Sequence, residues 1–96
     1  MKKRYDLLFL LTKNNESICF EYYAHTDSDT YELRMTNISI KPYQSKIRLC
    51  KSMKQLAYIS NYEADRLEKL GYKRSNLEMK NYKFILDYLI KQKTVN

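Results

Sequence analysis

The chain has 96 residues and carries 18 Lys and Arg against 11 Asp and Glu, a formal net charge of +7 at pH 7. Its 44% hydrophobic and 30% charged residues exclude a wholly disordered chain, and its length suits a single domain over residues 1–96. With one Gly and one Pro, it has no flexible linker, no Walker loop and no GxGxxG motif.

Residues 1–50 carry the period-two alternation of β-strands. The first apolar run, residues 7–11, is apolar on both faces and therefore suits a central strand. Apolar and polar residues then alternate over 18–25 and over 31–36, which is typical of half-buried strands. This half of the chain is therefore predicted to form an antiparallel sheet of three to four strands.

The end of this sheet is less regular. The alternation slips after Met35, so a bulge or a bend two residues later is needed to restore a single buried face. Ile47 and Leu49 then predict one more short strand, whose basic residues Lys46 and Arg48 point to solvent.

Residues 51–96 change to helical periodicity. Capping-box patterns, in which a Ser is followed three residues later by Glu or Gln, begin at Ser52, Ser60 and Ser75. Gly71 lies where a left-handed C-terminal cap is needed. The predicted helices cover residues 53–59, 61–70 and 76–92.

The fold class that follows is α+β, with an antiparallel sheet over 1–50 and three helices in the helical half, 51–96. The last predicted helix has an apolar face wider than one small sheet needs. We therefore leave open whether the chain is a monomer or a homodimer that pairs through this C-terminal helix.

Catalytic and metal-binding groups are few. Cys19 and Cys50 form neither a CxxC motif nor a ligand cluster, so they are expected to be strand residues, at least one of them buried, without a disulfide. His25 is the only His; Asp27 and Asp29 lie nearby, but these acids fit turn capping better than catalysis. We therefore expect no enzyme activity, no metal and no cofactor.

A signal peptide is not predicted. The apolar run at 7–11 is shorter than a secretory h-region of roughly 7–15 residues or a membrane span of about 20. The sequence therefore predicts a cytoplasmic protein without a membrane partner.

The positive charge lies in the second half. Residues 1–45 have no net charge, residues 46–96 carry the whole excess, and no acid occurs between Glu32 and Glu63. Two interpretations compete: a solvated, lysine-rich face, or a surface that binds a polyanion. The second identifies a candidate partner-binding set: Lys41, Tyr43, Lys46, Arg48, Lys51, Lys54 and Tyr58.

A helix-turn-helix over residues 53–71 is the alternative. Leu56, Ala57 and Leu67 lie at suitable offsets for this DNA-binding motif. Glu63 and Asp65, however, place negative charge at the end of the recognition helix that meets the bases. A plain helical hairpin explains the same pattern.

By its size, its bias toward Lys, Asn and Tyr and its lack of motifs, the chain resembles the small accessory proteins of phages and mobile elements, among them anti-CRISPR-like inhibitors and regulators. The resemblance implies a stoichiometric inhibitor or modulator that docks on a host protein or nucleoprotein complex in the host cytosol. Direct contact with nucleic acid stays open, and a helix-turn-helix-like DNA-binding regulator is the alternative function.

Overall fold

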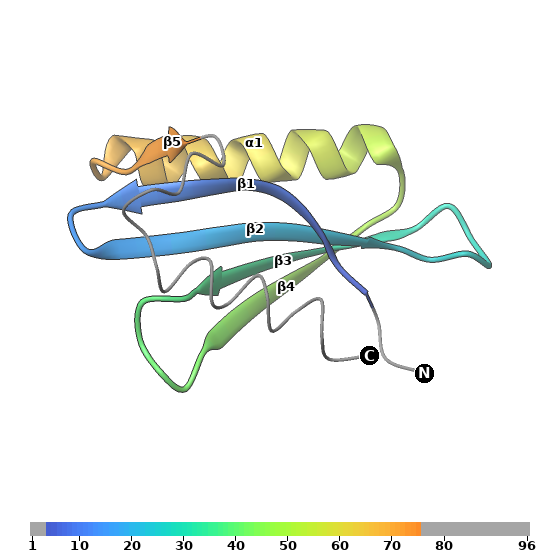
Figure 1. Cartoon of the computed structure of the whole chain (residues 1–96). Coiled ribbons are helices and arrows are strands. Elements are labelled where there is room, and N and C mark those ends of the chain that lie inside the picture. Colours follow the sequence, from blue (N-terminus) through green and yellow to red (C-terminus); the bar gives the residue numbers. More distant parts are fainter. Residues whose placement is uncertain (1–3, 76–96) are drawn as a thin grey trace.

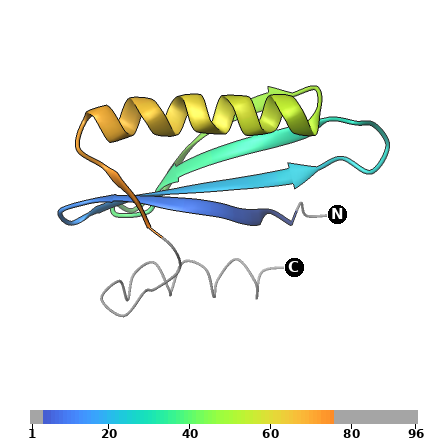
Figure 2. The same cartoon turned by 90° about the horizontal axis from the view of Figure 1, so that it is seen from above.

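The computed structural model describes residues 4–75. In this part of the chain five strands form one antiparallel sheet in the order β4-β3-β2-β1-β5, and one helix lies across one face of it (Figure 1, Figure 2). We call this side the helix face and the opposite side the far face. The elements are β1 (Asp6–Lys13), β2 (Glu16–Ala24), β3 (Tyr31–Asn37), β4 (Gln44–Cys50), α1 (Met53–Lys69) and β5 (Lys73–Ser75).

The fold is α+β, but the predicted arrangement of three to four strands followed by three helices is wrong. The sheet has five strands, and residues 53–69 form one helix in place of the two predicted at 53–59 and 61–70. After α1 the chain returns to the sheet as β5, beside β1. The third predicted helix, 76–92, and the homodimer contact assigned to it lie outside the described residues.

The alternation along β2 and β3 places the core. Phe20 pairs with Met35 across the two strands, and both side chains pack on the helix face against α1. The core cluster there consists of Leu11, Phe20, Leu33, Met35, Cys50, Leu56 and Ala64. Each fully buried large apolar side chain contributes roughly 1.5–3 kcal/mol to stability, so this layer between sheet and helix holds the fold together.

The slip in the alternation after Met35 coincides with the end of a strand, and there is no bulge at this point. β3 ends at Asn37. Ile38 follows outside the ladder but is 2% exposed, and its N–H donates to the carbonyl of Ser17 at 3.0 Å. The chain bends after Ile38, at residues 39–40, but Ile40 is 63% exposed, so the bend does not restore one buried face over both isoleucines.

β4 presents its residues to the opposite faces from those predicted. Lys46 and Arg48 are in register with core residues of β3, so they lie on the helix face. Ile47 and Leu49 lie on the far face and are 51% and 71% exposed. The basic pair contacts the carboxylate of Glu63 in α1, which was not predicted, and the two side chains remain 61% and 41% exposed.

The start of α1 follows the predicted capping box. The hydroxyl of the N-cap Ser52 accepts a hydrogen bond from the N–H of Gln55 at 3.0 Å. The Gln55 side chain accepts in turn from the N–H of Lys51, one residue before the cap. Two backbone donors at the helix start are thereby satisfied.

The break predicted at Ser60 does not exist. α1 continues through this residue, which is buried, and its hydroxyl donates to the carbonyl of Ala57 at 3.1 Å. A Ser followed three residues later by Glu also occurs inside helices, where the Ser bonds back to the preceding turn. Without a turn there is no helix-turn-helix in residues 53–71, and the helical hairpin is wrong for the same reason.

The end of α1 is capped as predicted by Gly71, whose φ is 103°. Its N–H donates to Glu68, and the N–H of Tyr72 donates to Leu67, which is the Schellman pattern. This cap turns the chain back toward the sheet. Arg74 of β5 then bridges to α1, with Asp65 at 3.0 Å and other acceptors nearby.

Candidate functional site

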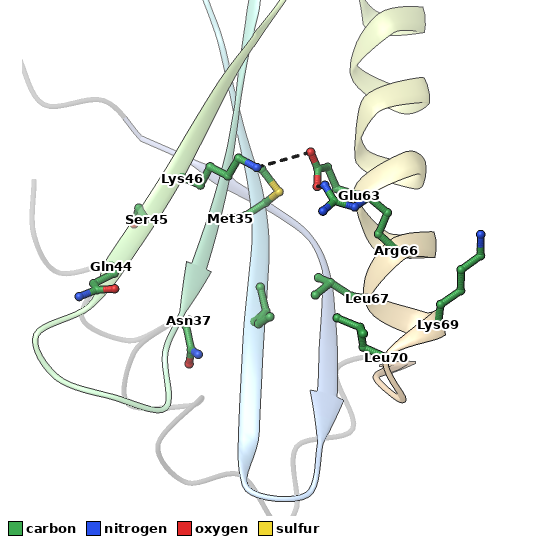
Figure 3. A pocket seen from close by; sticks show the side chains of 11 residues that line it. Met35, Asn37, Gln44, Ser45, Lys46, Glu63, Arg66, Leu67, Lys69 and Leu70 are labelled. Carbon is green, nitrogen blue, oxygen red and sulfur yellow. Dashed lines mark hydrogen bonds and ion pairs between the residues drawn. The ribbon is translucent and has the colours of Figure 1, made fainter.

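An open groove of about 690 Å³ lies between the first half of β4 and the last turns of α1 (Figure 3). We call it the β4–α1 groove. Figure 3 shows that its two walls come from different elements, with Lys46 on β4 and Arg66 and Lys69 on α1. Four apolar side chains line the groove: Ile18, Met35, Leu67 and Leu70. The remaining lining residues are polar or acidic: Asn37, Gln44, Ser45 and Glu63. The groove therefore combines apolar side chains with three cations.

Glu63 is the centre of the charges in this groove. Its side chain is only 8% exposed. One carboxylate oxygen, Oε2, lies 2.7 Å from Nη1 of Arg48 and 3.8 Å from Nζ of Lys46; the other, Oε1, lies 3.2 Å from Nη1 of Arg66. Because a buried carboxylate is costly without partners, these ion pairs explain why β4 turns its basic side chains inward.

The helical repeat explains the position of Glu63. Leu56, Ser60, Glu63 and Ala64 are the buried residues of α1, spaced three, four and seven apart. An acid on this inner stripe must meet the sheet, and the strand opposite it is β4. The same repeat leaves Arg66 and Lys69 at the edge of the stripe, where they remain exposed.

The charges do not cancel. Three cations face one carboxylate around Glu63, a formal surplus of two positive charges, and Lys69 adds a further cation to the groove. Lys46 and Arg66 are 61% and 60% exposed although both are paired with Glu63. They are therefore accessible to an additional anionic group.

The residues proposed from the sequence do not all meet at this groove. Lys46 lines it and Arg48 contacts Glu63 beside it. Lys41 and Tyr43 precede β4, and the other three follow it: Lys51, Lys54 and Tyr58. Seven residues of strand separate the two groups, about 20 Å. The structure brings together two of the seven.

Of the residues that line the groove, the predicted binding set contains only Lys46; the charged lining residues that it missed are Glu63, Arg66 and Lys69. Glu63 was interpreted as an acid in the first turn of a short helix, and that interpretation followed from the false break at Ser60. Extending the apolar stripe of residues 56–67 through the break would have placed Glu63 inside and predicted a basic partner for it.

A second polar cluster lies on the far face. His25 Nε2 is 2.8 Å from Glu32 Oε2, so this His contacts neither of the turn acids considered with it. The hydroxyl of Tyr5 donates to Glu32 at 3.0 Å, and Arg34 lies over the Tyr5 ring and pairs with Glu21. Burial and the bond to Glu32 raise the pKa of Tyr5 to about 12. On this face the contacts join β2 and β3 to Tyr5, just before β1, and to His25, just after β2.

The cysteines, the possible metal ligands and the length of the helix are the remaining features of residues 4–75. Cys19 and Cys50 are both free and both buried, and burial raises the pKa of each thiol. Over this range no three His, Cys, Asp or Glu side chains are grouped to hold a metal ion, and α1 is neither long nor apolar enough to cross a membrane.

Comparisons with known proteins give no match: no protein-family model, no curated protein and no solved structure is similar to this chain. The function must therefore be inferred from the groove and its surroundings.

Proposed function

We propose that this protein is a binding protein that acts without catalysis and docks through the β4–α1 groove on an acidic surface of another protein. The observation that carries the proposal is the surplus of positive charge on a groove with an apolar lining. Positive charge alone would suit any solvated surface. Combined with apolar side chains in a concave site, it suits a partner that offers both acidic and apolar groups.

An exposed apolar residue of the groove supports the same proposal. Leu70, at the end of α1, lines the groove and is 63% exposed. Large apolar side chains beside charged ones in a concave site are typical of protein–protein contacts. A partner protein therefore explains more of this surface than a polyanion that offers charge alone.

The test compares two double variants that change the net charge equally. Lys46→Glu with Lys69→Glu reverses two cations of the groove and spares Arg48, so that Glu63 keeps its nearest partner. Lys51→Glu with Lys54→Glu reverses two exposed cations beyond the far end of β4. Each variant and the wild type is used to capture proteins from cells of the source organism, with and without nuclease.

The proposal expects one protein to be captured by the wild type and the Lys51/Lys54 variant and lost with the Lys46/Lys69 variant. The captured protein is then purified, and its affinity for each variant is measured directly. We expect the groove variant to weaken this binding at least tenfold, and more strongly at low salt. Equal binding by both variants, or capture that disappears with nuclease, would overturn the proposal.

A further inference from the structure

β4 is the longer of the two edge strands of the sheet formed by the described residues. It pairs with β3 on one side, and no other strand among residues 4–75 pairs with it on the outer side. Its seven residues therefore present a row of backbone N–H and C=O groups along that edge. Natural proteins usually protect such an edge, because it is a template for pairing with another chain.

The basic and the apolar side chains of β4 lie on opposite faces of the sheet. Lys46 and Arg48 project on the helix face, toward the groove, whereas Ile47 and Leu49 project on the far face. Two neighbouring large apolar side chains are thus exposed on an edge strand, at 51% and 71%. The edge is basic on one side and apolar on the other over four consecutive residues.

From this pattern we infer the partner's chemistry: an extended segment that adds to the outer edge of β4 as a sixth strand, with acidic residues at alternate positions and apolar residues between them. The inference rests on the proposed function and specifies how the partner binds. Residues opposite each other in neighbouring strands lie on the same face. The acidic side chains of the added strand therefore meet Lys46 and Arg48, and the apolar ones meet Ile47 and Leu49.

A second copy of this chain does not satisfy the same pattern. Two β4 strands related by a two-fold axis keep the same face toward the same side, so basic residues would lie opposite basic residues across the pair. Like charges directly opposite each other destabilise a strand pair. The charge of β4 therefore favours an acidic segment of a different protein.

The probe is a capped seven-residue peptide in which four Glu alternate with three Val. Binding to the full chain, labelled with ¹⁵N, is followed by NMR at peptide concentrations up to about 1 mM. We expect the largest shifts at residues 44–50 and an affinity at least tenfold higher than that of the same peptide with Lys in place of Glu. Slower amide exchange along β4 is the second readout.

Two methylated peptides test strand pairing itself. One carries N-methyl groups on its Val amides and the other on alternate Glu amides. In an extended strand, alternate N–H groups point to opposite edges, so one of the two peptides loses its pairing edge and the other keeps it. We expect binding to be lost with one of them only. Ile47→Thr with Leu49→Thr is expected to weaken the binding of the unmodified peptide at least threefold. In the control, Lys51→Glu with Lys54→Glu, the protein should still bind the Glu peptide more tightly than the Lys peptide.

The possible failures are distinct. Equal binding of the two methylated peptides would overturn strand addition and leave docking in the groove intact. Strand addition would also be overturned if the Glu peptide bound no more tightly than the Lys peptide. The capture experiment with the Lys46/Lys69 variant decides the proposed function separately. If sedimentation shows that the protein alone dimerises and Ile47→Thr with Leu49→Thr separates the dimer, a second copy replaces the acidic segment as occupant of this edge.

Discussion

Arg48 of the edge strand and Glu63 of the helix are joined by a 2.7 Å ion pair that links α1 to the edge of the sheet. In the apolar core β4 meets the helix cluster through Cys50, and this ion pair adds a charged contact between the same two elements. The pair has a structural role and also determines the direction in which the basic side chains of β4 point.

The first prediction concerns this carboxylate. Glu63→Gln removes the only acid among three cations and is expected to lower the free energy of unfolding by about 1–3 kcal/mol. This loss of stability is smaller than the loss on breaking a fully buried ion pair, because the three cations are partly exposed. Urea unfolding measures the change. The control, Glu68→Gln, alters an exposed carboxylate and should cost less than about 1 kcal/mol.

The second prediction separates the two serines with the same sequence pattern. Ser52→Ala removes a helix cap and should cost about 1 kcal/mol. Ser60→Ala lies inside a continuous helix, so it should change stability by less than about 0.5 kcal/mol or increase it, because Ala is the best helix former. Thermal or urea unfolding of both variants provides the comparison. Equal losses would mean that residue 60 begins a helix after all.

The third prediction tests the orientation of β4. Ile47→Thr and Leu49→Thr change exposed far-face residues to another strand-forming residue and should each shift the free energy of unfolding by less than about 0.5 kcal/mol. Leu33→Ala, in the core on the helix face of the neighbouring strand, should cost roughly 2–5 kcal/mol. A large loss at residue 47 or 49 in urea unfolding would show that these side chains are buried.

The fourth prediction is a pH dependence. Burial and the bond to Glu32 raise the pKa of Tyr5 from 10.0 to about 12. As pH rises above 10, the unfolded chain releases this proton and the folded chain keeps it, so the unfolded state is favoured. Stability should therefore fall between pH 10 and about 12. Urea unfolding at three pH values, with Tyr5→Phe as the control, should show a shallower decline in the variant.

The sequence predicted the sheet through local rules. Alternation identified the residues of β2 and β3 that share the core face, because one face of each strand is buried by α1. Gly71 identified the end of the helix, because the Schellman cap requires a left-handed residue. Both signals depend on residues close together in the chain, and they needed no knowledge of the partner element.

What the sequence could not provide depends on contacts between distant residues. The inward direction of Lys46 and Arg48 requires a buried acid in α1, and the acid was misplaced when Ser60 was interpreted as a cap. β5 has only three residues, too few for alternation to be visible, and its position is determined by pairing with β1. The groove follows from these long-range contacts and was missed with them.

The two edges of the sheet differ in length, seven residues in β4 and three in β5. The number of backbone hydrogen bonds that an edge can offer to an added strand grows with the length of that edge. The β5 edge therefore offers far fewer of them than the β4 edge. A segment that adds to this sheet by backbone pairing would be held more firmly at β4, so the two edges form one strong and one weak site for strand addition.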